Sequence, residues 1–407
     1  MKTAESPMVT GPLLKVAIAL MNAHIFLIAL FHLKDWNKTV VTIRLLQGKI
    51  KKYIGPNSIQ KIALVDGRFH WDMYGEGWPS SGFIRNVKRE CSRVNASPYD
   101  HVGMRNVLFG LTTKCPLQCE HCYEWNNLNV RERLGFADLQ TIIEKLVAYG
   151  VGQIHLGGGE PMMRFEEIIQ LLKLYSHQAG FWIVTSGYQF TAERAILLKA
   201  SGLTGVCVSI DHHEEEPHNN FRHYRQSYEM AQTAARAARK AGLVTALSLC
   251  ATREYTQRQN IASYVKMGRK LGVSFIQFLE PRAVGHYEGK DVMLSDDQKK
   301  ILESVFLETN TTRAHQKDPI VIYHEYYKPT LGCRGSGNGA LYIDPLGEVH
   351  ACPFCRKSAG NMLRDEMESC VERLLGTGCP VPLPPVHASA RTSQQAPNAN
   401  AVRPALK

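Results

Sequence analysis

From residue 106 onward, short apolar runs alternate with longer segments in which apolar residues recur every three or four positions. The runs predict β-strands at 107–113, 154–158, 181–186, 206–210, 244–252 and 274–279. The longer segments predict helices at 136–149, 165–177, 192–201, 224–241, 260–271 and 296–309. This alternation is typical of right-handed βαβ units around a parallel sheet. Six units are too few for a closed eight-unit barrel. We therefore predict an α/β fold with a partial, open (β/α)6 barrel over residues 106–312.

The N-terminal segment, residues 1–33, has a different pattern. Residues 16–33 are almost continuously apolar, but they include Asn22, His24 and His32. A spanning helix needs roughly 20 predominantly apolar residues, so this length is borderline. No small-residue cleavage site follows, which weakens a signal-peptide interpretation. We expect a helix that lies on or anchors to a membrane surface, packs against the protein's own core, or spans a bilayer. The sequence leaves these three alternatives open.

Residues 34–105 predict a mixed pre-domain. It contains a strand-like run at 40–46, a turn at Gly55–Pro56 and an aromatic-rich stretch at 69–78. Six basic residues lie between positions 34 and 54, and Asp35 alone opposes them. A basic flank beside an apolar helix favours the cytosolic side of a membrane or contact with anionic lipid.

The C-terminal part of the chain is rich in cysteine and poor in helical signals. Residues 313–379 hold five cysteines, and we predict a small α+β domain there. Residues 380–407 are rich in Pro, Ala, Ser, Gln and Asn, and no acidic residue follows Glu372. Such a segment buries too little apolar surface to fold, so we expect it to be disordered.

Composition narrows the class of protein. Of 407 residues, 44% are hydrophobic, which permits a sizeable core, and the net charge of +11 suits anionic surfaces or substrates. The eleven cysteines gather in close groups, which favours metal or iron–sulfur centres in a reducing compartment over disulfides. We expect a cytoplasmic main body, with membrane association through the N-terminal helix as an open alternative. The basic residues form no aromatic-interleaved stripe, so no nucleic-acid partner is expected.

The strongest chemical signal is a cysteine triplet, Cys115-x3-Cys119-x2-Cys122, after the first predicted barrel strand. Three thiolates this close can each bind one iron of a cuboidal cluster and leave the fourth iron without a protein ligand. Loops at the carboxyl ends of parallel strands are where such folds place their sites. A structural zinc site normally has four ligands from two separated pairs, and here only His121 could join the three cysteines as a fourth ligand. An electron carrier with four cysteine ligands would need another cysteine beside the triplet, and the sequence has none there.

Together with Gly158-Gly159-Glu160-Pro161 after the second strand, the triplet resembles the radical S-adenosylmethionine (SAM) superfamily. The resemblance covers roughly residues 106–281. It implies a [4Fe–4S] cluster whose open iron chelates SAM, cleavage of SAM to a 5′-deoxyadenosyl radical, and hydrogen abstraction from a substrate. It also implies that the edge formed by Gly158, Gly159 and Glu160 holds the SAM amino group, with Glu160 as acceptor. A tight turn between strand and helix is the alternative interpretation of these glycines.

Further site residues follow from the same resemblance. Ser186 ends the third strand, where the family often has a small polar residue near the SAM carboxylate. Ser209 and Asp211 end the fourth strand, where polar groups commonly meet the ribose. The alternative interpretation of these three residues is that each is an ordinary polar cap at the end of a strand. His121 stands where the family usually has a larger aromatic residue near adenine. The histidine-rich and acidic run at 211–218 is interpreted as a solvated loop open to substrate rather than a metal site.

The second cysteine group resembles the start of the SPASM/twitch extension found in many radical SAM enzymes. Its spacing is Cys333-x13-Gly347-x4-Cys352-x2-Cys355, with Cys370 and Cys379 further on. The resemblance implies one auxiliary [4Fe–4S] cluster, with Cys333, Cys352, Cys355 and Cys379 as candidate ligands. The fourth ligand stays open among Cys355, Cys370 and Cys379. A zinc ribbon is the alternative for this segment.

The resemblance implies an iron–sulfur enzyme of oxidoreductase or other C–H-modifying type. Auxiliary clusters in this family accompany peptide and protein modification, so a peptide or protein is the expected substrate. A reduced flavodoxin or ferredoxin-like protein is the expected electron donor. Action on a lipid, another membrane-held metabolite or a different small molecule is the first alternative. An iron–sulfur electron-transfer protein and a zinc-ribbon binding protein are the alternatives from other classes.

Overall fold

A nine-stranded sheet forms the centre of the computed structural model, which describes residues 7–54, 60–96, 103–333, 335 and 339–375. Its strand order is β10-β9-β8-β7-β6-β5-β4-β11-β12, and every pair from β10 to β11 is parallel. This confirms the predicted α/β class with a parallel sheet. The six predicted barrel strands correspond to β4 (Asn106–Thr112), β5 (Gln153–Gly158), β6 (Gly180–Thr185), β7 (Gly205–Ser209), β8 (Val244–Cys250) and β9 (Phe275–Leu279).

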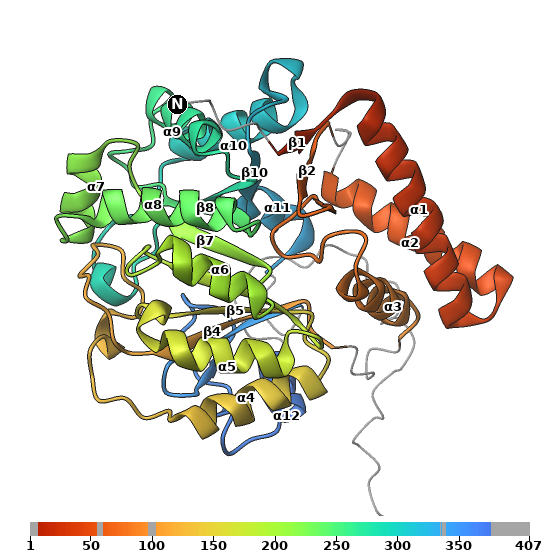
Figure 1. Ribbon diagram of the computed structural model, residues 1–407, viewed down its shortest axis with the longest axis horizontal. Coiled ribbons are helices and arrows are strands. Elements are labelled where there is room, and N and C mark those ends of the chain that lie inside the picture. The colour runs from red at the N-terminus through yellow and green to blue at the C-terminus, as the bar shows by residue number, and fades with distance from the viewer. Residues whose placement is uncertain (1–6, 55–59, 97–102, 334, 336–338, 376–407) are drawn as a thin grey trace, which may run out of the picture.

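Helices cover the outer side of this sheet (Figure 1). Each presents an apolar stripe to the strands; in α4, for example, Leu139, Ile142, Ile143 and Leu146 are fully buried at helical spacing. The 3-10 turns η1 (Trp125–Asn127), η2 (Pro161–Arg164), η3 (Gly285–Tyr287) and η4 (Arg313–His315) lie in the connections. The helices are α4 (Phe136–Ala148), α5 (Phe165–Tyr175), α6 (Ala192–Ala200), α7 (Glu215–Arg222), α8 (Ser227–Lys240), α9 (Arg258–Leu271) and α10 (Asp296–Thr311).

The C-terminal segment extends the same sheet from both edges. β10 (Ile320–Tyr323) pairs with β9, whereas β11 (Ala340–Ile343) pairs with β4 at the opposite edge. β12 (Val349–His350) then runs antiparallel to β11, and α11 (His324–Leu331) and α12 (Met367–Leu374) complete the segment. Residues 313–375 therefore share the sheet with the barrel. Cys379 and residues 380–407 lie outside the described residues.

The pre-domain and the N-terminal helix form one unit beside the barrel. It comprises β1 (Met8–Val9), α1 (Gly11–Leu33), α2 (Trp36–Ile54), β2 (Ile62–Val65), β3 (Arg68–His70) and α3 (Ser81–Asn95). The strand expected at 40–46 is wrong, because these residues lie inside α2. Thr39, Thr42, Ile43 and Leu46 turn toward the protein at spacings of three, four and seven, which is a helical stripe. The expected Gly55–Pro56 turn lies outside the described residues.

A buried lysine attaches this unit to the end of the barrel. Lys61 Nζ donates to the carbonyls of Thr309 at 2.8 Å, His315 at 3.0 Å, Asp318 at 2.8 Å and Pro319 at 3.1 Å. Burial lowers the pKa of Lys61 to about 7, although Asp318 partly offsets the effect. These bonds set the position of β2 against the segment between α10 and β10.

The interior of the sheet holds a histidine among aromatic rings. His155 lies in β5, with its ring stacked on Tyr74 at 5.2 Å and on Trp182 at 5.7 Å between centroids. Burial lowers its pKa to about 3 from an ordinary value of 6.5. The imidazole is therefore neutral in the folded protein throughout the physiological range.

This burial predicts a pH dependence of stability. The folded-state pKa of His155 lies below its unfolded value, so the unfolded chain binds the extra proton as pH falls below 6.5. The stability linked to His155 is complete above that pH and is lost progressively toward pH 3. Between pH 7 and pH 5 the parent protein should lose about 2 kcal/mol more than His155→Gln. Urea unfolding of both proteins at the two pH values tests this, and parallel losses in the two proteins would contradict it.

Candidate active site

The cysteine triplet lies in the loop that follows β4 at the carboxyl end of the sheet. Asn129 fixes its first member, because its side chain accepts from the Cys115 amide and donates to the Cys115 carbonyl, both at 3.0 Å. The middle of the loop is bonded to the end of α7, where the Phe221 carbonyl accepts from the Glu120 amide at 3.0 Å. The loop is thus held from two sides by parts of the chain distant in sequence.

A third support comes from η3. The His286 amide donates to the Cys122 carbonyl at 3.0 Å, and His286 Nδ1 lies 3.0 Å from the Cys119 carbonyl oxygen. Gly285 has a φ of +60°, and a Cβ at this position would stand 2.2 Å from the Cys122 carbonyl oxygen. Any residue with a side chain would clash with this carbonyl oxygen, so the close packing of η3 on the cysteine loop requires glycine at position 285.

The three thiols have a chemistry that fits an iron–sulfur cluster. Burial raises the pKa of Cys115 and of Cys122 to about 12 and raises that of Cys119 as well. Free thiols in such surroundings are poor nucleophiles, whereas a bound metal displaces the protons and turns the same sulfurs into ligands. Three soft donors in one short loop suit iron–sulfur chemistry. Across the described part of the chain, no three His, Cys, Asp or Glu side chains converge closely enough to hold a single ion.

A buried ion pair stands directly behind the triplet. Arg222 bonds Asp211 Oδ2 through Nε at 2.7 Å and through Nη2 at 2.5 Å, and its Nη1 donates to Cys119 Sγ at 3.6 Å. Asp211 Oδ1 also accepts from the Cys250 amide at 2.9 Å. Burial alone would raise the pKa of Asp211, but the Arg222 guanidinium, the neighbouring histidines and the bond from the Cys250 amide together hold the pKa below its usual value.

The interpretation of residues 211–218 as a solvated loop is wrong in two respects: its second half is helical, and Asp211 and His218 are buried, although residues 214–217 are exposed. Residues 215–222 form α7, and the His218 side chain is fully buried. His218 Nδ1 accepts from the Asp211 amide at 3.1 Å. Asp211 turns inward because Arg222, at the end of α7, pairs with its buried carboxylate.

The Gly158–Glu160 turn packs against the start of the cysteine loop. The Gly159 amide donates to the Thr112 carbonyl, and the Glu160 amide donates to the Lys114 carbonyl, both at 2.7 Å. Gly158 has a φ of +114°, and a Cβ on Gly159 would stand 2.3 Å from the Lys114 carbonyl oxygen. The protein's own backbone therefore explains both glycines, as the tight-turn alternative supposes. Contact with SAM at this edge stays a prediction.

Two of the predicted site residues meet at the ends of β5 and β6. Glu160 Oε1 accepts from the Met162 amide at 3.1 Å and from Thr185 Oγ1 at 2.7 Å. Its Oε2 accepts from the Ser186 amide at 2.9 Å and from Ser186 Oγ at 2.6 Å. Burial raises the pKa of Glu160, and these four bonds counteract the rise. Ser209, at the end of β7, remains partly exposed.

His121 lies in the cysteine loop, with its ring against α7. Its ring stacks on Phe221 with centroids 5.0 Å apart, and its Nδ1 atom is buried without a hydrogen-bond partner within the residues described. Burial lowers its pKa to about 4, so the imidazole is neutral. A flat, neutral ring at this position is compatible with the expected packing near adenine, which stays a prediction.

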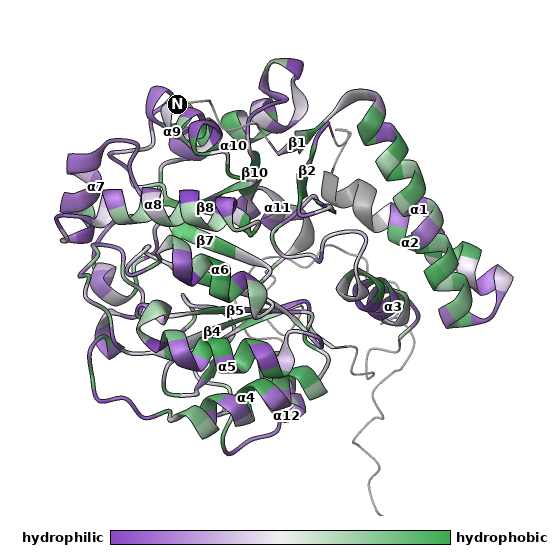
Figure 2. Cartoon of the chain, in the orientation of Figure 1, coloured by the Kyte–Doolittle hydropathy of each residue, from purple (hydrophilic) through white to green (hydrophobic). Residues whose placement is uncertain are grey.

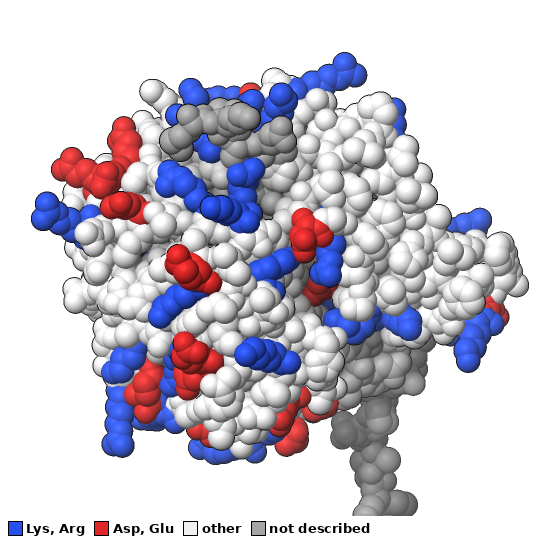
Figure 3. Space-filling model, in the orientation of Figure 1, with Lys and Arg blue, Asp and Glu red and all other residues white. Residues whose placement is uncertain are grey.

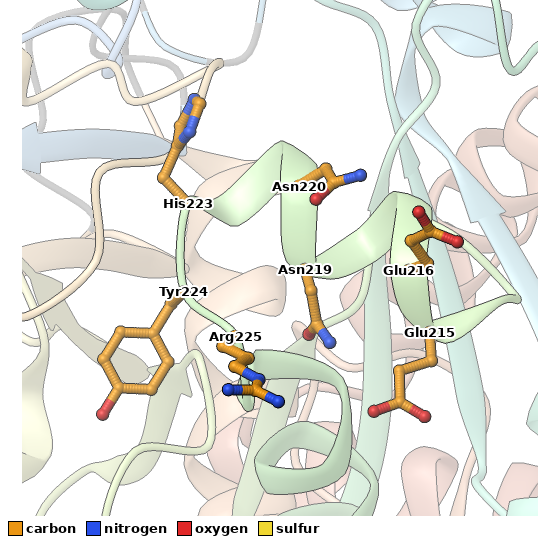
Figure 4. A pocket seen from close by; sticks show the side chains of 7 residues that line it. All are labelled: Glu215, Glu216, Asn219, Asn220, His223, Tyr224 and Arg225. Atoms are coloured by element: carbon orange, nitrogen blue, oxygen red, sulfur yellow. The ribbon is translucent and has the colours of Figure 1, made fainter.

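An open hollow of about 720 Å³ runs along α7 (Figure 4). Its acidic residues stand at the start of α7, and its basic residues follow the end of the helix. His223 Nε2 lies 2.6 Å from Glu120 Oε1, which joins this hollow to the cysteine loop. The lining residues are Glu215, Glu216, Asn219, Asn220, His223, Tyr224 and Arg225.

The second cysteine group is partly assembled. The Cys355 amide donates to the Cys352 carbonyl at 3.0 Å, and a hydrogen bond from Cys355 lowers the pKa of Cys352 to about 6. Gly335, two residues after Cys333, approaches the same place, because a Cβ there would stand 3.2 Å from Cys352 Cβ. Cys370, by contrast, is fully buried in the hydrophobic core on α12.

The two cysteine groups are neighbours. The Tyr123 ring, next to the triplet, lies edge-on to Tyr342 at 5.8 Å and to Phe354 at 6.4 Å. Glu124 Oε1 accepts from Tyr342 Oη at 2.8 Å and from Arg356 Nη1 at 2.5 Å. No local sequence pattern predicted these contacts, because each joins residues more than 200 positions apart.

A thiol-lined loop at the carboxyl end of a parallel (β/α) sheet is the arrangement expected of a barrel enzyme that holds an iron–sulfur cluster. Residues 110–259 match the model of the Radical SAM superfamily. This segment of the chain belongs to the radical SAM superfamily, the class of enzymes that combines a [4Fe–4S] cluster with SAM.

Several characterised proteins are similar to it. Mycofactocin maturase MftC of Mycolicibacterium smegmatis is 28% identical over 266 residues, which cover 63% of this chain and 66% of that protein. The AdoMet-dependent heme synthase of Methanosarcina barkeri is 26% identical, covering 63% of this chain and 79% of the synthase. The PqqA peptide cyclase of Xanthomonas campestris is also 26% identical, covering 61% and 66%. The chain thus spans just under two thirds of the length of the maturase and the cyclase.

The fold resembles that of Streptococcus suis SuiB bound to its precursor peptide SuiA. The TM-score is 0.55 at 14% sequence identity, over 80% of this chain and 75% of SuiB. This likeness confirms a radical SAM type of fold with a C-terminal extension.

The buried ion pair predicts a large loss of stability when one partner is removed. Asp211→Ala leaves the Arg222 guanidinium buried without its carboxylate and should cost about 3–5 kcal/mol. The matched control is Asp291→Ala, which removes an exposed pair with Arg253 (2.6 Å) and should cost less than about 1 kcal/mol. Urea midpoints followed by circular dichroism compare the two variants. A small loss for both would show that Arg222 finds another partner.

Proposed function

We propose that this enzyme modifies a peptide or protein at a site built from Cys115, Cys119 and Cys122. Held by these thiolates, a reduced [4Fe–4S] cluster would supply the electron that cleaves SAM to a 5′-deoxyadenosyl radical, which abstracts hydrogen from the substrate. The observation that carries the proposal is the contact between the triplet loop and the second cysteine group through Tyr123 and Glu124.

The chain's own residues have distinct roles in this proposal. Arg222 donates to Cys119 and carries a positive charge beside the thiolate, which favours the ligand form. The backbone edge of residues 158–160 would receive the SAM amino group. The Glu160 carboxylate already accepts four hydrogen bonds, so the amino group would have to displace one of these donors. Ser186 would face the SAM carboxylate.

The remaining contacts would lie at the end of β7. Ser209 and Asp211 are assigned to the ribose hydroxyls, with His121 against adenine. Asp211 keeps its bonds to Arg222 and Cys250 in the structure. Asp211 can therefore accept hydrogen bonds from the ribose hydroxyls only through the carboxylate lone pairs that these bonds leave free.

An auxiliary [4Fe–4S] cluster is proposed on Cys333, Cys352 and Cys355, with Cys379 as the fourth ligand. The closeness of Cys352, Cys355 and the Cys333 segment supports this choice. The burial of Cys370 in the core argues against that residue as a ligand. Such a cluster would lie next to the SAM site, where it could exchange an electron with substrate or with a reduced flavodoxin or ferredoxin-like donor.

The names of the similar proteins support a peptide substrate. They include a maturase and a peptide cyclase, and SuiB is seen with a precursor peptide. A lipid or another membrane-held metabolite is the second candidate, favoured by the exposed apolar residues of α1. Candidate peptides encoded beside the gene, and separately a lipid extract, would be incubated with the enzyme and SAM. A mass change in one of the two preparations would decide between them.

The first functional test follows SAM cleavage. Protein reconstituted without oxygen and given dithionite and SAM should form 5′-deoxyadenosine, measured by chromatography. Replacing Cys115, Cys119 and Cys122 together by Ala should abolish the product, because the cluster loses its protein ligands. Cys91→Ala removes a buried thiol in α3 and should leave the yield unchanged. Bound iron without 5′-deoxyadenosine would favour the electron-transfer alternative.

A second test concerns the auxiliary cluster. Replacing Cys352 and Cys355 by Ala should lower the iron content by about four atoms per chain, while SAM cleavage continues at the triplet. Iron and zinc are measured together by plasma emission. Zinc in the parent protein that disappears in the variant would instead establish the zinc-ribbon alternative.

A further inference from the structure

The helix α1 has an unusual distribution of polar and apolar side chains. Two of its three histidine and asparagine side chains bond to the protein: Trp78 Nε1 donates to His24 Nδ1 at 2.9 Å, and His32 Nε2 lies 3.0 Å from Ser92 Oγ. Ile28 and Ala29 are buried on the same unit. One face of α1 is therefore fixed against the protein by packing and by hydrogen bonds.

The opposite side of α1 is apolar and open to solvent. Five large side chains on it are between 48% and 77% exposed, and their spacings of three, four and seven place them on one stripe. The neighbouring helix α2 adds three more at 50–61%. Figure 2 shows α1 as a mainly hydrophobic helix at the edge of the molecule. We call this set the outer apolar face: Leu13, Val16, Leu20, Leu27, Phe31, Trp36, Val41 and Leu45.

The charges around this face are predominantly basic. Lys15, Lys34, Lys38 and Arg44 lie on or between the two helices. Asp35 is the one acidic residue between positions 11 and 54, and its Oδ1 accepts from the Lys38 amide at 2.7 Å. In Figure 3 the surface at this edge is largely uncharged, with basic side chains near its ends. An apolar stripe with basic flanks and a tryptophan is the pattern of a helix that lies in a membrane interface.

We propose that the outer apolar face rests on an anionic lipid bilayer, with α1 parallel to the membrane plane. A span by α1 would break the bonds of His24 and His32 to the pre-domain. A second copy would place the same basic flanks against each other, because a two-fold interface is self-complementary. Residues 376–407 carry no acidic residue that could match those flanks. A bilayer with negative headgroups satisfies both the apolar stripe and the charge.

Flotation of the full-length reconstituted protein with phosphatidylcholine vesicles tests the surface, with and without about one third phosphatidylglycerol. The parent protein should float with the anionic vesicles, and added salt should weaken the binding. Leu20→Glu with Phe31→Glu should reduce binding at least about tenfold, because two charges enter the apolar layer. The matched control is Ile196→Glu with Leu197→Glu, two exposed apolar residues of α6, and it should bind like the parent.

Each other outcome overturns the proposal. If the parent protein does not float, or if both double variants lose vesicle binding equally, α1 has no specific role in membrane binding. A parent dimer that Leu20→Glu with Phe31→Glu dissociates, without vesicle binding, would make this face a protein interface. Resistance of the expressed protein to alkaline carbonate extraction would show a span. Far-ultraviolet circular dichroism spectra equal to that of the parent would confirm that both double variants fold, whether or not the proposed reaction is observed.

Discussion

A buried guanidinium organises the carboxyl end of the barrel. Arg222 reaches Asp211 after β7 and Cys119 in the loop after β4, so one side chain joins three elements that are separate in the sequence. A buried charge is strongly destabilising unless it is paired. The ion pair therefore fixes the position of the end of α7. The cysteine loop is fixed in turn, because the Glu120 amide donates to the Phe221 carbonyl at the end of α7. The arrangement of the thiols depends on this pair.

Much of the barrel was predictable because its strands are buried on both faces. Such strands appear as continuous apolar runs, and the run at 274–279 corresponds to β9 at Phe275–Leu279. The helices were predictable from their apolar stripes, as in α4 and α10. The cysteine triplet needed only its spacing. In each case the information lies within one short segment of the chain.

What sequence reasoning missed depends on contacts between distant segments. The β-branched run at 40–46 is locally strand-like, and only its packing in the N-terminal unit makes it part of α2. Glu124 and Arg356 carry no motif, although together they join the two cysteine groups. Glu160 was predicted as an acceptor for a ligand, yet its oxygens are occupied by Thr185, Ser186 and Met162. Hydrogen-bond saturation of this kind depends on the assembled strands.

The pairing of β11 with β4 has a consequence for biosynthesis. Ala340 lies opposite Asn106, so more than 200 further residues must be synthesised before this edge of β4 can pair with β11. During translation the nascent barrel therefore exposes an unpaired strand edge directly before the cysteine loop, and such edges promote association with other chains. The edge is covered only when the C-terminal segment has been made and β11 can pair with β4.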